Sequence, residues 1–305
     1  MSRIYRQKSE LPIALEYAGR HWSAGFGALD ITPGFRTPLG FTPRTDYALL
    51  TGFLNYRWQS IGFFRQVAAR LRFEDAYDHQ PGGGIGRYHQ HTDRVVSSYL
   101  DFTLPAATSF SFGYTRLFLR VDGTEFSGLD RGFLFLGSEA WRWFGWNLFL
   151  RAGDEVIYTD LVDDGPAQPS SFVNLSLATS TRPIAPLRLA LNLTTSTIWR
   201  RTVARARDTR YAQSAIPRLR VQAQISRALG LRLIGEYRFE QFFRRDGALD
   251  SQRKVLGADI LATYLVHPGQ SLQLGWSLRA AGNLELPLRN VARGGVVKVA
   301  YLWRL

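Results

Sequence analysis

The sequence predicts an all-β fold: a transmembrane antiparallel up-and-down β-barrel of about 14 strands (roughly 12–16), with both termini in the periplasm. Three observations predict this fold. Apolar and polar residues alternate in segments along the whole chain of 305 residues, short and long connectors alternate between these segments, and aromatic rings collect near the segment ends. We expect one barrel domain over residues 1–305, with residues 1–10 as a short periplasmic lead-in.

Alternation with a period of two is typical of strands, because successive side chains of a strand point to opposite faces of the sheet. In LRLALNLTTS (187–196), leucines at every second position alternate with smaller or polar residues. The segments RLRVQAQIS (218–226), LRLIGEYRFEQFF (231–243) and LQLGWSL (272–278) alternate in the same way. Helical spacing fits none of these windows, so the sequence predicts strands.

The connectors between the segments sort into two kinds. Tight turns are predicted at 59–62, 104–108, 141–144, 183–186, 227–230 and 267–270. Longer, polar, glycine-rich connectors are predicted at 24–45, 75–93, 121–130, 152–170, 200–216, 246–252 and 281–293. Outer-membrane barrels sort their connectors this way, with short periplasmic turns and longer extracellular loops. The sorting also predicts an even strand count.

Composition is consistent with strands that lie in lipid. The chain is 45% hydrophobic and 13% aromatic, yet no run approaches the roughly 18 apolar residues of a membrane-spanning helix. A β structure crosses lipid only when closed, because lipid offers no partners to backbone groups. Rings near strand ends suit the two bilayer interfaces; the alternative is a soluble β domain with these rings in its core. The rings are Trp22, Tyr56, Trp58, Trp143, Trp146, Trp199, Phe242, Phe243, Tyr301 and Trp303.

The formal net charge is +13, and arginines are scattered along the strands. No nucleic-acid motif accompanies them, so a nucleic-acid partner is not expected. An arginine-rich lumen would favour anionic solutes, whereas Arg–Glu ladders across strands would fill the bore for structure alone. The predicted inward-facing residues are Arg57, Arg70, Arg72, Glu74, Asp101, Arg151, Arg188, Arg218, Arg220, Arg232, Glu236, Arg238, Glu240, Asp259, Arg279, Lys298 and Arg304.

The last segment, GGVVKVAYLWRL (294–305), has an apolar face formed by Val297, Val299, Tyr301, Trp303 and Leu305. It resembles the C-terminal strand of bacterial outer-membrane proteins that the barrel-assembly machinery recognises, although Leu305 replaces the usual Phe. The resemblance implies export to the outer membrane and lipid as a partner. Since MSRIYRQKSELPIALEY has no signal-peptide pattern, we expect the native signal to be missing from this sequence.

Three stretches resemble one poorly characterised family of bacterial outer-membrane proteins. They are PLGFTPRTDYALLTGFLNYRW (38–58), the stretch from LRLIGEYRF to HPGQSLQLGW (231–276), and VVKVAYLWRL. In that family the barrel usually follows a module related to family-9 carbohydrate-binding domains. No such module is visible here, so the resemblance implies the barrel alone, with a periplasmic or surface carbohydrate-binding partner as an expectation.

Few residues suggest catalysis or a cofactor. The chain has no cysteine, and no cofactor is expected. His89 and His91, next to Asp93, are weak candidates for a metal site in a predicted polar loop. A barrel hydrolase needs a serine and a histidine together on its outer wall, and we can pair none of His21, His79 or His267 with a serine. An enzyme is therefore not expected.

The sequence thus predicts a bacterial outer-membrane barrel. Its predicted function is a pore or translocation module with a cationic lumen for small anionic or sugar-type solutes. One alternative is a non-conducting barrel that anchors or assists a carbohydrate-binding protein. A second alternative is an outer-membrane hydrolase.

Overall fold

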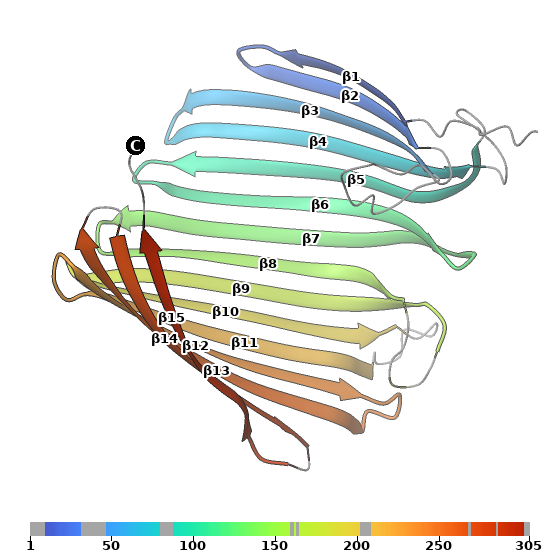
Figure 1. Ribbon diagram of the computed structural model, residues 1–305. Coiled ribbons are helices and arrows are strands. Elements are labelled where there is room, and N and C mark those ends of the chain that lie inside the picture. Colours follow the sequence, from blue (N-terminus) through green and yellow to red (C-terminus); the bar gives the residue numbers. More distant parts are fainter. Residues whose placement is uncertain are drawn as a thin grey trace, which may run out of the picture. The chain divides into compact units, whose positions relative to one another are not determined.

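A computed structural model of the protein describes residues 10–31, 47–79, 88–158, 162, 165–201, 209–267, 270–284 and 286–301. Over these ranges the chain forms fifteen strands of one sheet, each hydrogen-bonded to its neighbours in the chain (Figure 1). No helix in the described ranges is long and apolar enough to span a bilayer. The predicted all-β, antiparallel up-and-down topology is confirmed. The strands are β1 (Glu10–Ala18), β2 (Trp22–Ile31), β3 (Tyr47–Ile61), β4 (Phe64–His79), β5 (Tyr88–Leu104), β6 (Thr108–Val121), β7 (Thr124–Trp141), β8 (Phe144–Ile157), β9 (Gln168–Ile184), β10 (Leu187–Arg200), β11 (Thr209–Gln224), β12 (Leu229–Phe243), β13 (Leu249–His267), β14 (Gln270–Asn283) and β15 (Arg289–Tyr301).

The intervals between strands alternate in length, as the sequence predicts. Those that follow odd-numbered strands are short: 19–21, 62–63, 105–107, 142–143, 185–186, 225–228 and 268–269. Those that follow even-numbered strands are longer, with one exception: 32–46, 80–87, 122–123, 158–167, 201–208, 244–248 and 284–288. Antiparallel neighbours therefore place the short turns at one edge of the sheet and the longer intervals at the other.

The exception is the connection between β6 and β7, where the predicted long connector at 121–130 is wrong. The strands meet through Asp122 and Gly123 alone, and both residues have positive φ, 49° and 80°. Two-residue hairpins of this kind continue the twist of their strands. The other predicted connectors are too long, because the strands run into them: β9, for example, already begins at Gln168.

The strand count differs from the even number that the sequence predicts, because most of β2, from residue 24 to Ile31, lies inside the predicted connector 24–45. Its sequence, WSAGFGALDI, is rich in glycine and alanine, so its apolar alternation is weak. With an odd number of described strands, β1 begins at the edge of the longer intervals and β15 ends at the edge of the short turns. The expectation that the chain begins and ends at the same edge is therefore wrong for these strands.

Two compact units divide the chain. Unit 1 comprises residues 1–105 and 111–133, and unit 2 comprises residues 106–110 and 134–305. Strands β1–β5 belong to unit 1, and β8–β15 belong to unit 2. The predicted single domain over residues 1–305 stays a prediction.

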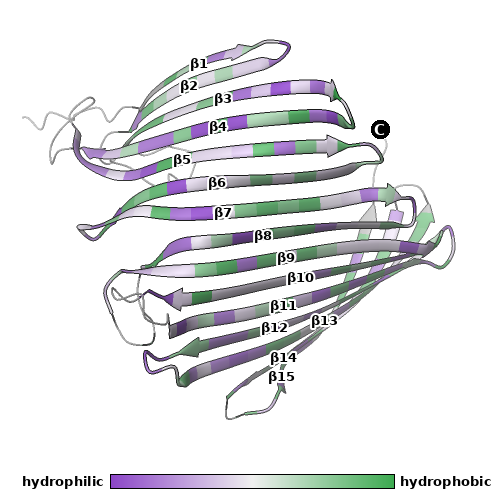
Figure 2. Cartoon of the chain, turned by 180° about the vertical axis from the view of Figure 1, so that it is seen from behind, coloured by the Kyte–Doolittle hydropathy of each residue, from purple (hydrophilic) through white to green (hydrophobic). Residues whose placement is uncertain are grey.

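Each unit has two chemically different faces, and hydrophobic and hydrophilic residues alternate along the strands (Figure 2). In unit 2, register places Leu233, Ile260 and Trp276 opposite one another on β12–β14, and about 40% of each side chain is exposed. In unit 1, Leu54 pairs with Leu71, and both are exposed. We call this side of each unit the apolar face and the side with the arginines the arginine face.

The apolar face of unit 1 has a group of rings near the short-turn edge. Tyr56 lies between Trp22 and Trp58, and each pair of ring centroids is 4.3 Å apart in edge-on geometry. These rings come from the beginning of β2 and the end of β3. In unit 2, the predicted ring of Trp143, beside the turn between β7 and β8, is more than half exposed. The predicted placement of rings near strand ends is confirmed for these residues.

Candidate functional site

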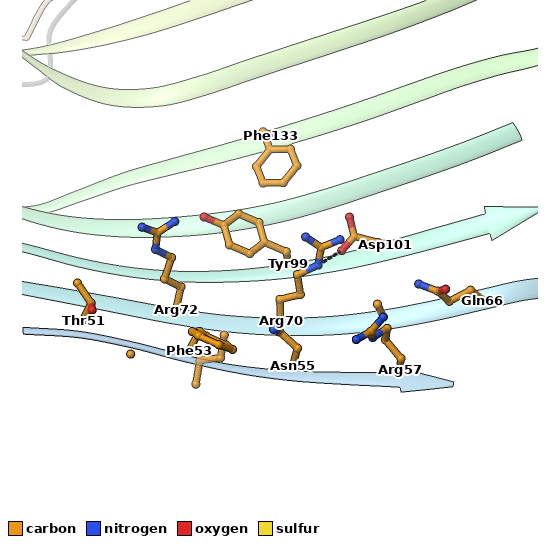
Figure 3. Close-up of a pocket in the computed structure, with 13 residues that line it drawn as sticks. Thr51, Phe53, Asn55, Arg57, Gln66, Arg70, Arg72, Tyr99, Asp101 and Phe133 are labelled. Carbon is orange, nitrogen blue, oxygen red and sulfur yellow. Dashed lines mark ion pairs between the residues drawn. The ribbon is translucent and has the colours of Figure 1, made fainter. Parts of the chain in front are cut away.

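A cavity of about 760 Å³, which we call the ring cavity, lies on the arginine face of unit 1 (Figure 3). Its wall comes mainly from β3, β4 and β5, with Phe133 from β7. Arginines, amides and aromatic rings line it together. The side chains that define it are Thr51, Phe53, Asn55, Arg57, Gln66, Arg70, Arg72, Tyr99, Asp101 and Phe133.

Strand register brings these side chains to one face. Asn55 of β3 is opposite Arg70 of β4, and Arg70 is opposite Tyr99 of β5. Paired residues of neighbouring strands point to the same face, and so do residues two apart on one strand. Alternation therefore adds Phe53 and Arg57 to the same surface. Arg57, Arg70, Arg72 and Asp101, which the sequence predicts to face inward, share this face. That the face lines a lumen stays a prediction.

Glycines make room for the rings of the cavity. A Cβ atom on Gly25 would lie 2.3 Å from the ring of Phe53, so this ring covers the backbone of β2. A Cβ atom on Gly113 would lie 2.3 Å from the ring of Phe133 and 2.6 Å from that of Tyr99. The Tyr99 and Phe133 centroids are 5.4 Å apart. The rings thus occupy positions that any larger residue at these glycines would displace.

The arginines of the ring cavity are only partly neutralised. Arg70 Nε lies 2.9 Å from Oδ2 of Asp101, and Oδ1 of Asp101 accepts a hydrogen bond of 2.8 Å from the Ser111 hydroxyl. Arg72 forms an ion pair with Glu74, two residues along β4. Within the described part of the chain, Arg57 has no carboxylate partner. The cavity therefore keeps a positive charge beside its aromatic rings.

On the arginine face of unit 2, the middle of the strands carries a small ion-pair ladder. Arg218 is opposite Glu236 in the register of β11 and β12, with Nε 3.8 Å from the carboxylate. Arg238 approaches the same carboxylate at 3.6 Å. Arg218 and Glu236 thus form a cross-strand pair, whereas Arg238 and Glu236 are two residues apart on β12. That such pairs fill the bore of a barrel stays a hypothesis.

The other described residues of unit 2 that were predicted to face inward lie on the same face but do not join that ladder. Among the described residues, no carboxylate lies within ion-pair distance of Arg188, Arg220, Arg232, Arg279 or Lys298. Glu240 is opposite Ser214 and Arg253, and Asp259 is opposite Ile234. Arg151 approaches Glu155 at 3.8 Å and lies over the ring of Phe172 at 4.9 Å. Arg304 lies outside the described residues.

The predicted assembly-signal strand corresponds to β15. Val297 and Val299 are opposite Leu274 and Leu272 on the apolar face, and both valines are at least 70% exposed. Tyr301 ends the strand. Trp303 and Leu305 lie outside the described residues, and recognition by the assembly machinery stays a prediction.

The predicted polar loop around His89 and His91 is wrong, because both residues lie in β5. The register of β4 and β5 shifts between Asp78 and His79. His79 pairs with Tyr88 and Asp78 pairs with Gln90, so His89 has no paired residue on β4. His91 contacts the Asp75 carboxylate and stacks on Phe118 with centroids 4.6 Å apart. In the described residues, no group of three or more histidine and acidic side chains could hold a metal ion.

Two other histidines, His79 and His21, contact groups other than serine. His79 Nε2 lies 2.7 Å from Asp30, which also accepts a hydrogen bond from the Tyr88 hydroxyl. His21 Nδ1 lies 3.0 Å from the carbonyl oxygen of Arg57. These contacts provide no support for the serine–histidine pair that a hydrolase would require.

Sequence reasoning missed the rings of the cavity. Phe53, Tyr99 and Phe133 are on the arginine face, although the sequence suggests that rings belong with lipid. A signal was present, because Phe53 and Tyr99 are each spaced by an even number of residues from a predicted inward residue, Arg57 or Asp101. Asn55 and Gln66 are likewise an even number of residues from Arg57 and Arg70, so alternation along the strand places them on the same face.

Comparisons with known proteins identify no family. No family model matches the sequence, and no curated protein matches it. Among solved structures, the chain is similar to OmpT (in-vitro folded), an outer membrane protein of Vibrio cholerae. That match covers 97% of this chain and 96% of the other, with 8% sequence identity and a TM-score of 0.39. A likeness this distant carries no argument about function, and the family resemblance noted from the sequence stays a prediction.

Proposed function

We propose that this protein is a bacterial outer-membrane β-barrel that conducts small anionic or sugar-type solutes. In this proposal the sheet closes on itself and the apolar faces contact lipid. The support is the wide exposure of leucine, isoleucine and tryptophan on one side of the strands, since large exposed apolar surfaces mark contact with lipid or another protein. An odd number of strands does not prevent closure, because odd-stranded membrane barrels exist.

The observation that carries the conducting function is the ring cavity. Arg57 supplies a positive charge without a carboxylate partner among the described residues, and Phe53, Tyr99 and Phe133 supply flat apolar surfaces beside it. Asn55 and Gln66 add side-chain amides, which can form hydrogen bonds with the hydroxyl groups of a sugar-type solute. A solute with both an anionic group and a sugar-like face would contact all three kinds of group. Charged groups that line a pore also set its ion selectivity.

Conductance in planar lipid bilayers tests this proposal. Purified protein is inserted into a bilayer that separates two KCl concentrations, and the reversal potential of single channels is measured. We expect stable channels that prefer chloride over potassium. Absence of any channel, with insertion verified by protease protection in liposomes, would contradict the pore.

The alternative that such a result would favour is a non-conducting barrel that anchors or assists a periplasmic or surface carbohydrate-binding protein. The family resemblance of the sequence supports that partner, and co-purification from the outer membrane would test it. Insertion of either form is proposed to use the barrel-assembly machinery through β15, whose apolar face carries Val297 and Val299. A hydrolase receives no support from the described histidine contacts.

A further inference from the structure

The short-turn edge of unit 2 has a second concentration of positive charge, separate from the ring cavity. Arg182 of β9, Arg188 of β10 and Arg232 of β12 line one hollow of about 510 Å³. The hollow lies beside the turn at Ala185 and Pro186. We call these three arginines the edge cluster.

Strand register sets the geometry of the edge cluster. Arg188 is opposite Gln222 of β11, and Gln222 is opposite Arg232. The two arginines are therefore two strands apart on one face, a backbone separation of about 10 Å. Arginine side chains are long enough to bring two guanidinium groups to one small ligand across that distance. Gln222 lies between them and offers an amide to the same ligand.

The arginines of the edge cluster repel one another without compensation. Over the described ranges, none of the three has a carboxylate within ion-pair distance. A neighbouring hollow of about 270 Å³ shares Arg182 and Arg188 and adds Arg142. Glu139 lines that neighbouring hollow but forms no ion pair with these arginines in the described structure. Like charges that are close together on a sheet face destabilise it.

The same strands show that such repulsion is relieved elsewhere. Four residues from Gln222 along β11, Arg218 is opposite Glu236, and Arg238 shares that acid. The unpaired state of the edge cluster is therefore a local property and does not follow from the arginine content of the face. An external anion would remove the repulsion.

We propose that the edge cluster binds a small oxyanion with two or more negative charges, of the phosphate or sulfate type. Guanidinium groups present paired N–H donors that match the oxygens of such anions, and the planar fork favours them over chloride. The Gln222 amide and the Thr263 hydroxyl, which lines the same hollow, are further donors. The edge cluster lies on the arginine face, so a dissolved anion is the expected ligand and a lipid head group is not. This inference does not depend on conduction.

Calorimetric titration of the detergent-solubilised protein with inorganic phosphate, at constant ionic strength, tests the site. We expect saturable binding of one phosphate, weakened roughly tenfold or more by Arg188→Gln and by Arg232→Gln, since each removes a charged hydrogen-bond donor. The matched control is Arg220→Gln, which removes an unpaired arginine of the same face and leaves the edge cluster intact. Circular dichroism verifies that each variant keeps its strands.

Three results would overturn the inference: no saturable phosphate binding to the folded protein, an equal loss in Arg220→Gln, or binding of phosphatidylglycerol micelles but not of phosphate. If phosphate does not bind but chloride-selective channels form, the anion site is rejected and the proposed pore is retained. If phosphate binds but no channels form, the pore is rejected and the anion site is retained.

Discussion

In unit 1 the arginines share their face with aromatic rings, whereas in the edge cluster of unit 2 they share it with an amide and with one another. Arg57 and Arg72 lie in a cavity that Phe53, Tyr99 and Phe133 also line. Arg182, Arg188 and Arg232 line a hollow without any aromatic ring. Rings favour ligands with flat or apolar faces, and clustered guanidinium groups favour compact anions.

The comparison teaches that arginine content alone does not predict what a sheet face binds. In unit 1, Asp101 and Glu74 each neutralise one arginine, and the rings line the same cavity as the remaining arginine, Arg57. In unit 2, Glu236 lies near two arginines in the middle of the strands, whereas no carboxylate of the described residues lies within ion-pair distance of the edge cluster. The neighbours of each arginine set its role.

The largest expected effect is on the apolar face of unit 2, which both proposals require to be in lipid. Leu219→Arg places a charge at an exposed leucine of β11, and it should destabilise the folded protein in bilayers by about 2–4 kcal/mol. The control Ser214→Arg, on the arginine face opposite Glu240, should change stability little. Urea unfolding in lipid vesicles measures both, and equal effects would contradict the assignment of the two faces.

The packing of the ring cavity should give the next largest effect. Gly113→Ala forces a Cβ atom against Phe133, Tyr99 and the Ser98 carbonyl oxygen, which lies only 2.7 Å from the added atom. Overpacking of this kind costs about 1–3 kcal/mol. Gly235→Ala in unit 2 is the control, because nothing lies within 4 Å of its added Cβ. Unfolding of both variants in urea compares them, and a neutral Gly113→Ala would show that the rings are loosely held.

Charge in the ring cavity should have a smaller effect that is confined to selectivity. Arg57→Gln removes the one cavity arginine without a carboxylate partner among the described residues, so the preference for chloride should fall by roughly two- to fivefold. Arg188→Gln removes an equal charge from unit 2 and tests whether the edge cluster contributes to selectivity. Reversal potentials in a KCl gradient measure both, and an unchanged potential in Arg57→Gln would remove the cavity from the conduction path.

The smallest expected effect concerns the ladder of unit 2. Glu236→Gln leaves Arg218 and Arg238 without their shared acid. Both ion pairs exceed 3.5 Å and are more than a third exposed, so solvent screens them and the loss should stay below about 1 kcal/mol. Thermal unfolding in detergent would reveal a larger loss, which would mean that the ladder is a main source of stability.

Much of the sheet could be predicted from the sequence. The period-2 pattern is strong wherever leucines alternate along a strand with arginines or other polar residues. The segment 187–196 is such a case and forms most of β10. The strand β2 could not be predicted in the same way, because its glycines and alanines give little contrast between apolar and polar positions. The apolar group that covers Gly25 comes from another strand, as the ring of Phe53. The hairpin at Asp122 and Gly123 was missed because the predicted connector contains parts of two strands.

The candidate sites were predicted in part, for a related reason. Alternation identifies which residues share a face, and Arg57, Arg70 and Asp101 do line one cavity. It does not show which residues meet across strands, because this depends on register and bulges. Arg182 escaped prediction for that reason: the register of β9 and β10 shifts between Leu187 and Leu189, next to the turn.

The most direct test of the central claim, that the apolar face meets lipid and the arginine face meets water, uses two neighbouring residues of β11. The sequence has no cysteine, so Leu219→Cys and Arg220→Cys each introduce a single thiol on opposite faces of one strand. In lipid vesicles, a membrane-impermeant maleimide should modify the Arg220→Cys protein, and only a lipid-soluble reagent should modify the Leu219→Cys protein. Equal modification of both thiols by the impermeant reagent would contradict the account.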